Sequence, residues 1–436
     1  MKLSRKVFVL VIALVCFAFL FTACGKTTTS ESGNNQTTTP QTQATAETTK
    51  PPPKVELVIM IAATDDKAME EIVKKTIAKF PDYNITSKPW ETANAEKIIK
   101  TTIAAGDPID IAMYWPNQME TFVNANMALD LTPYLDENGG EWKNTFVDKA
   151  LEIGTYNGKT YAVPYASVYP LIEANKDILD QAGVTIPDGP LAWDDFIKIC
   201  DTIKEKTGIY PIALNKDWAS WAIRNTLLTV WPDKAGMDDF AAGKIPFTDP
   251  LVVKAFDAAK ELYDNHMYPG KGAITTTLDA INVAFKSGKV AMKMDVNVLS
   301  AKSIKESGLK NVQVVSWPHL GTLDYLLGGC NGYMIPAGTA FPKEAAEVMK
   351  YLTSVEILQL QVDNGVPVTI KGVKSDDPNF MLYSKDSQKV YPKEIINLSP
   401  EISDYIVNKM PANYIFNGQA SLEELEKLRL EAMKGK

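Results

Sequence analysis

Short apolar runs alternate with amphipathic stretches between residues 55 and 113, and this alternation limits the folds open to the chain. The run VELVIMIA at 55–62 shows little polar alternation, which is typical of a strand covered on both faces. Asp65 begins a predicted helix with apolar residues at intervals of three and four: Met69, Ile72, Val73, Ile77 and Phe80. A strand at 83–87, a helix at 94–105 and a strand at 109–113 follow. This order of elements predicts a parallel α/β sheet.

The predicted sheet also indicates where a ligand would bind. In open α/β sheets, ligands lie beyond the carboxyl ends of the strands. The loops at 63–66, 89–91 and 114–117 follow the three predicted strands, so they are the candidate site segments.

A second set of strand and helix patterns fills the rest of the chain. Strands are predicted at 160–165, 290–294 and 332–335, and helices at 193–206, 250–265 and 342–352. A last helix at 421–433 begins with a predicted capping box of Ser421 and Glu424. The roughly 380 residues from Lys54 onward exceed the roughly 250–300 residues that one core serves, so two domains are expected.

The first 53 residues have the order of a secretory signal that ends at a lipidated cysteine. Three cations precede an apolar run from Val7 to Phe21, and Cys24 opens a polar stretch. This segment resembles a bacterial lipobox, although Phe21 stands where that pattern usually has Leu. We therefore expect a signal peptide at 1–23 and a lipid anchor on Cys24; the alternative is an uncleaved membrane anchor. Residues 24–54 then form a Thr/Pro-rich tether with too few apolar side chains to fold.

Charge and cysteine content exclude several classes of protein. Removal of residues 1–23 takes away three cations and no anion, so the net charge changes from −8 to −11. This balance argues against nucleic acid or an anionic membrane surface as a partner. Cys200 and Cys330 lie in apolar surroundings, so two buried free thiols are favoured over a disulfide bridge.

Five segments resemble the extracellular solute-binding proteins of ABC importers, in the sugar-binding group that includes maltose-binding protein. They are AAGDPIDIAMYW (104–115), NGKTYAVPY (157–165), EANKDILDQAGVTIPDGPLAWDDFIKIC (173–200), AFKSGKVAMKMD (284–295) and GGCNGYMIPAGTAFPKEAAEVMKYLTS (328–354). The resemblance implies an α/β, two-lobed, type II periplasmic-binding-protein-like fold whose lobes are joined by crossing hinge strands. It places lobe one at 55–167 plus 322–376 and lobe two at 168–321 plus 377–436.

The candidate ligand-binding residues combine aromatic faces with carboxylates and amides, which suit the C–H patches and the hydroxyl groups of a sugar. Trp115, Trp218 and Trp221 match places where the family has sugar-stacking residues, although each could instead fill a core. The polar candidates are Asp65, Asp66, Asp295 and Asn331. Tyr165, with Tyr169, flanks the first crossing between the lobes and serves either the site or hinge packing. The sequence departs from the family at Asp295, where a stacking aromatic is usual nearby, while Trp142 and Trp193 are expected in the core.

Catalysis finds little support in the sequence. His266 and His319 are the only histidines, about fifty residues apart, which gives no zinc spacing. The neighbouring carboxylates do not have the arrangement of a glycosidase pair, which must face each other across a cleft. We therefore expect no enzyme, no cofactor and no metal, with calcium left open. The expected protein is a monomeric, lipid-anchored receptor on the outer face of the cytoplasmic membrane, with a carbohydrate ligand and ABC permease subunits as partners. The alternatives are a surface adhesin or sensor with the same fold, or a cell-surface glycosidase whose carboxylates come from distant segments.

Overall fold

The computed structural model describes residues 54–62, 67–89, 91 and 94–434. The predicted signal peptide, the lipid-anchor Cys24, the tether, Asp65 and Asp66 lie outside these residues. Among the described helices, none is both long and apolar enough to cross a bilayer.

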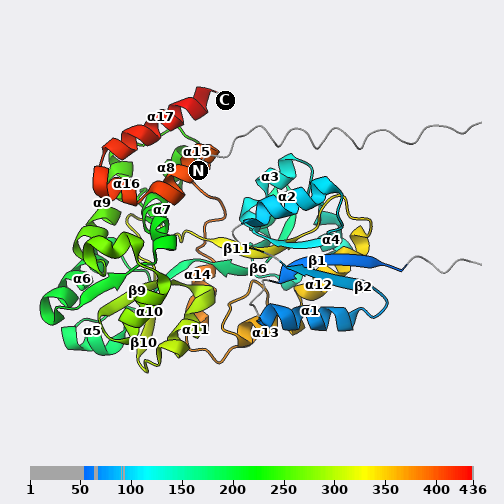
Figure 1. The fold of residues 1–436 in the computed structure, drawn as a ribbon, viewed down its shortest axis with the longest axis horizontal. Helices are drawn as coiled ribbons and strands as arrows, with labels where there is room; N and C mark the ends of the chain where they lie inside the picture. Colours follow the sequence, from blue (N-terminus) through cyan, green and yellow to red (C-terminus); the bar gives the residue numbers. More distant parts are fainter. Residues whose placement is uncertain (1–53, 63–66, 90, 92–93, 435–436) are drawn as a thin grey trace, which may run out of the picture. The chain divides into compact units, whose positions relative to one another are not determined.

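Five strands form the first sheet, in the order β2-β1-β3-β11-β6 (Figure 1). Their bounds are β1 Glu56–Ala62, β2 Asn84–Pro89, β3 Ile111–Tyr114, β6 Ala162–Val168 and β11 Gly329–Met334. Strand β1 pairs in parallel with β2 and β3, whereas β11 pairs antiparallel with β3 and β6. The predicted parallel sheet is therefore confirmed for its first three strands.

Helix α1 (Lys67–Lys79) follows β1 and buries the apolar side chains of Met69, Ile72 and Val73, as their spacing predicts. The prediction was wrong for Ile77, which is 41% exposed. Ile77 lies about 80° around the helix from Met69, at the edge of the apolar stripe. Thr76 is buried instead, and its hydroxyl donates to the carbonyl of Ile72, 2.7 Å away.

Two further helices beside the first sheet agree with the predicted spans, α2 (Ala95–Ala105) and α12 (Pro342–Leu352). Helix α13 (Val355–Asp363), which follows α12, was not predicted. Trp142 is buried in this core, where its indole N–H donates to Thr353 Oγ1 at 2.9 Å.

Four strands form the second sheet, in the order β10-β7-β9-β8. Their bounds are β7 Pro170–Asn175, β8 Tyr210–Ala213, β9 Val290–Val296 and β10 Val312–Ser316. Strand β7 pairs antiparallel with β10 and β9, and β8 runs parallel to β9. The helices that accompany the second sheet include α6 (Trp193–Thr207), α7 (Ala219–Thr229), α9 (Pro250–Asn265), α11 (Asn297–Ser307) and α14 (Phe380–Ser387).

Separate apolar cores accompany the two sheets. One contains buried residues from 57–166 and 333–370, and the others contain buried residues from 169 to 425. Leu326 and Leu327 pack with the second group although they follow the predicted boundary at 321/322. The exact lobe boundaries stay a prediction.

Tyr169 joins the two sheets, because β6 ends at Val168 and β7 begins at Pro170. The Asn297 side chain holds the chain on both sides of this joint. Its Oδ1 accepts from the Tyr169 backbone N–H at 3.0 Å, and its Nδ2 donates to the Ser167 carbonyl at 2.8 Å. The Tyr169 ring is fully buried, and its hydroxyl donates to the carbonyl of Tyr383 at 2.8 Å. Tyr169 therefore serves hinge packing in this conformation.

The predicted capping box at Ser421 and Glu424 was wrong. Helix α17 spans Ala420–Lys434, so Ser421 lies inside the helix. Its hydroxyl donates to the Asn413 carbonyl at 3.0 Å, and Glu424 accepts from the Tyr405 hydroxyl at 2.6 Å. Both side chains are thus used for contacts with the preceding segment.

Cys200 and Cys330 are free and buried, as predicted. Burial raises the pKa of both thiols above its ordinary value. In the described part of the chain, no three His, Cys, Asp or Glu side chains are grouped so that they could hold a metal ion.

Candidate functional site

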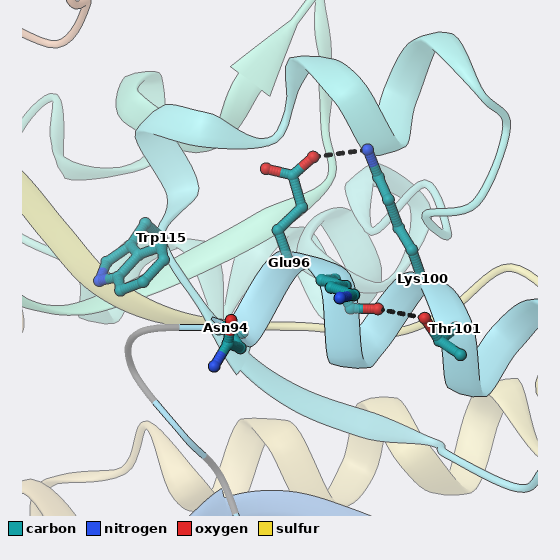
Figure 2. Close-up of a pocket in the computed structure, with 7 residues that line it drawn as sticks. Asn94, Glu96, Lys100, Thr101 and Trp115 are labelled. Atoms are coloured by element: carbon teal, nitrogen blue, oxygen red, sulfur yellow. Dashed lines mark hydrogen bonds and ion pairs between the residues drawn. The ribbon is translucent and has the colours of Figure 1, made fainter. Parts of the chain in front are cut away.

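A pocket of about 590 Å³ opens where β3 ends and α2 begins (Figure 2). Trp115 enters it from the loop after β3, which is one of the three predicted site loops. The other lining residues come from α2 and its N-cap: Asn94, Ala95, Glu96, Lys97, Lys100 and Thr101. The pocket therefore lies at the carboxyl edge of the first sheet, where ligands of α/β sheets bind.

Trp115 supplies an aromatic face to this pocket. Its indole is half-buried and lies 5.2 Å from the buried Tyr114 ring, measured between centroids. Its carbonyl accepts from the Gln118 backbone N–H at 2.9 Å, so the loop turns at once into a short 3-10 helix. A half-buried indole combines apolar packing on the protein with an apolar contribution to the pocket that it lines.

Glu96 is the most constrained polar group of the pocket. Its Oε1 accepts from Lys100 Nζ at 2.6 Å and from Thr121 Oγ1 at 3.1 Å, and its Oε2 accepts from the Tyr114 hydroxyl at 3.1 Å. Burial acts to raise the pKa of Glu96, but Lys100, Thr121 and Tyr114 outweigh it, so the pKa is lowered. The carboxylate is therefore ionised and held in one orientation.

Lys100 is held from two directions. Its ammonium bonds Glu96 and lies 5.2 Å from the centroid of the Phe122 ring, within the range of a cation–π contact. Figure 2 shows Trp115 on one side of Glu96 and Lys100 on the other. The pocket thus presents an apolar face beside fixed, charged hydrogen-bonding groups.

The first sheet brings Asn331 to the same edge. Gly332 pairs with Tyr114 at the end of the antiparallel ladder, so Asn331 and Trp115 are the next residues of the two strands at this edge. A second contact ties these loops, because Asn117 Oδ1 accepts from the Cys330 backbone N–H at 3.2 Å. Asn331 is half-buried and lies at the point where the β11–β6 register shifts.

Trp218 and Trp221 lie beside the second sheet. They follow the carboxyl end of β8, with Trp218 just before α7 and Trp221 in its first turn. Both are half-buried and pack on the second core. Since β8 and β9 are parallel, these tryptophans and the start of α11 lie at the same edge of the second sheet.

Tyr165 and Asp295 are buried in the structure. Tyr165 stacks on Tyr333 with centroids 5.0 Å apart, and its hydroxyl lies 3.4 Å from Met113 Sδ. Asp295 is 1% exposed, and its Oδ2 accepts from Lys293 Nζ at 2.6 Å. In this conformation both side chains face protein neighbours.

The sequence analysis did not single out the residues of α2. Asn94, Glu96 and Lys100 follow the predicted loop at 89–91, which was a usable signal. An i,i+4 pair such as Glu96 and Lys100 is, however, an ordinary pattern on exposed helices. Only the packing of α2 against the end of β3 shows that this pair lines a pocket.

Comparisons with known proteins place the chain among binding proteins. A model of the family described as bacterial extracellular solute-binding protein matches residues 67–380. The chain is similar to the multiple sugar-binding protein of Streptococcus mutans, with 27% identity over 330 residues that cover 71% of this chain and 74% of that protein.

Solved structures share the fold. A chitin oligosaccharide binding protein is similar with a TM-score of 0.71 and 22% identity, covering 87% of this chain and 99% of that one. The solute-binding protein RafE in complex with raffinose is similar with a TM-score of 0.69 and 21% identity, with coverage of 87% and 99%. The predicted two-lobed, type II periplasmic-binding-protein-like fold is confirmed.

Proposed function

This chain belongs to the family of bacterial extracellular solute-binding proteins, and we propose that it captures an oligosaccharide between its two lobes and delivers it to the permease of an ABC importer. The similar proteins reported above are named for sugars: multiple sugars, chitin oligosaccharide and raffinose. These names support a carbohydrate ligand and a role in binding without catalysis.

The pocket beside Trp115 is the observation that carries the proposal. A pyranose ring has flat C–H patches that stack on an indole, and hydroxyl groups that bond to a fixed carboxylate. Trp115 and the ionised Glu96 offer these two features side by side. We assign them, with Asn331, to the part of the site on lobe one.

Trp218 and Trp221 supply the part on lobe two. In this proposal, Asp65 and Asp66 add carboxylates from the loop after β1, and Tyr165 and Asp295 support the site from behind. Ligand shifts the equilibrium between open and closed forms because only the closed form lets both lobes contact the sugar.

The proposed location follows from the first 54 residues and the family. Cys24 carries the lipid anchor, and a tether of roughly 30 Å holds a monomeric receptor near its permease. Labelling of cells with an alkyne-modified fatty acid tests this anchor: the wild type incorporates label and Cys24→Ser does not. Label that persists on Cys24→Ser contradicts the anchor and leaves the binding function untouched.

A ligand screen by melting curve tests the function. A sugar that binds only the native state at about 100 times its Kd raises the free energy of unfolding by about 2.7 kcal/mol. We expect a rise in Tm with at least one oligosaccharide from a panel that includes raffinose and chitin oligosaccharides. Uptake of the same labelled sugar by cells with and without the gene separates an importer from an adhesin or sensor, since only an importer gene affects uptake.

A further inference from the structure

A buried polar layer lies on one face of the second sheet, apart from the pocket beside Trp115. On β9, Lys293 and Asp295 occupy alternate positions, so they project to the same face of the sheet, and Asn297 follows at the start of α11. On the neighbouring β7, Glu173 pairs with Lys293. All four side chains are at least 95% buried.

Lys293 is the single cation at the centre of this layer. Its ammonium donates to Asp295 Oδ2 at 2.6 Å, Ser303 Oγ at 2.7 Å and Asn282 Oδ1 at 2.9 Å. The nearest oxygen of Glu173 lies farther away, at 3.4 Å. Asp295 also accepts from the Val296 backbone N–H at 2.8 Å, so it is well compensated as an anion. Glu173 Oε2 accepts from Ser303 Oγ at 3.1 Å, but it lies farther from the ammonium than Asp295 does, so Glu173 is the less compensated of the two carboxylates.

Helices α11 and α14 close the layer. Ile304 of α11 and Tyr383 of α14 pack with Leu171 and Val314 in a small apolar cluster over the sheet. Among the described residues, three buried oxygens here make no hydrogen bond of ordinary geometry, Glu173 Oε1, Ser300 Oγ and Tyr383 Oη, although the Ser300 hydroxyl lies close enough to act on the pKa of both Glu173 and Tyr383. Unpaired buried polar atoms destabilise a fold, so a change in the number of donors alters this packing.

Few other charged groups face the layer. The side chains of α11 that face the layer are Ser300 and Ser303, which carry no charge. Those of α14 are Tyr383 and Asp386. Asp386 is engaged by the Ser316 hydroxyl and by Lys389, whose Nζ lies 3.3 Å away. With both Glu173 and Asp295 ionised around Lys293, the layer has an excess of one negative charge.

We infer that Glu173 is a buried proton-binding site that makes the packing of α11 and α14 on the second sheet depend on pH near neutrality. A proton on Glu173 removes the excess charge and lets this carboxyl group donate a hydrogen bond as well as accept one. Burial, opposed by Lys293 and reinforced by Asp295, raises the pKa of Glu173 to about 7.

The direction of the effect follows from linkage. A carboxyl group with a raised folded-state pKa binds its proton more tightly in the native protein than in the unfolded chain. Its stabilising contribution is complete below its ordinary pKa of 4.5 and is lost as the pH rises through about 7. Asn297, which holds Tyr169 at the joint between the sheets, is the first residue of α11, one of the two helices that close the layer.

Melting curves of the unliganded protein from about pH 5 to about pH 8 test this inference. The wild type is compared with Glu173→Gln, which keeps the shape of the protonated acid, and with Glu306→Gln on the exposed side of α11. Near pH 5 the Tm of Glu173→Gln should match the wild type, and near pH 8 it should be higher by at least about 2 °C. The control should show no such pH-dependent difference. A difference between wild type and Glu173→Gln that stays constant with pH would overturn the inference.

Infrared spectroscopy of the wild type provides a test that needs no folded variant. We expect the C=O band of a protonated, buried carboxyl group that persists above about pH 6 and disappears with a midpoint near the raised pKa. Absence of any carboxyl band that titrates above about pH 6 would overturn the inference. Neither measurement involves a sugar, so its outcome is independent of the proposed function.

Discussion

Lys100 Nζ lies 2.6 Å from Glu96 Oε1, and this pair fixes the carboxylate that faces the pocket beside Trp115. The two side chains remain 31% and 43% exposed, so the pair adds little to stability. The pair instead favours ligand binding, because a carboxylate that is already oriented accepts hydrogen bonds from sugar hydroxyls without first being ordered.

Replacement of Glu96 by Gln is expected to weaken sugar binding by at least about tenfold, equivalent to about 1.4 kcal/mol. The change removes the charge from the acceptor and leaves the fold intact. Titration calorimetry with a sugar found in the screen measures the affinity, and Glu120→Gln, an exposed change close to Thr121, serves as the control. Equal affinity of Glu96→Gln and the wild type would remove Glu96 from the site.

Asn297→Ala is expected to lower the free energy of unfolding by about 2–4 kcal/mol. The substitution removes two hydrogen bonds and leaves the Tyr169 N–H and the Ser167 carbonyl without their partner at the joint between the sheets. Denaturant unfolding gives the value. Asn311→Ala, which loses one exposed bond to Asp177, should change stability by less than about 0.5 kcal/mol. Equal effects of the two substitutions would contradict the account of the joint.

Cys200 and Cys330 should be inert to a thiol reagent in the native protein. Both are fully buried, and burial raises the pKa of each thiol, so the reactive thiolate is scarce. An absorbance assay with an aromatic disulfide reagent should show reaction of these two thiols only after denaturation. The double variant Cys200→Ser, Cys330→Ser identifies their share of the signal. Rapid native labelling of either would show that its surroundings open readily.

Much of the fold could be predicted because periodicity carries it. The strand at 55–62 and the helices at 193–206, 250–265 and 342–352 agree with the structure to within a residue or so. Such patterns reflect which face of a helix or strand is buried, and the spacing of apolar residues within the segment itself indicates that face. Thr76 and Ile77 show where periodicity fails as a guide to burial. The polar Thr76 at the centre of the apolar stripe is buried, whereas the apolar Ile77 at its edge is exposed.

The site was less predictable, because it depends on contacts between distant segments. Trp115 and Asn331 could be proposed separately, but only the β3–β11 ladder, which ends at the pair of Gly332 and Tyr114, brings them to the same edge of the sheet. Asp295 has a carboxylate of the kind that binds sugar hydroxyls. In the structure this carboxylate is buried and forms an ion pair with Lys293, two residues earlier on the same strand face. Glu96 and Lys100 resembled an ordinary surface pair until α2 was placed beside the end of β3.

Calorimetric titration of the wild type and its tryptophan variants with the sugar panel tests the central claim most directly. We predict that at least one oligosaccharide binds the wild type. We expect Trp115→Ala and Trp221→Ala each to weaken that binding by at least about tenfold, while Phe416→Ala on the exposed surface leaves it unchanged. No binding across the panel, or unchanged affinity in both tryptophan variants, would contradict the account.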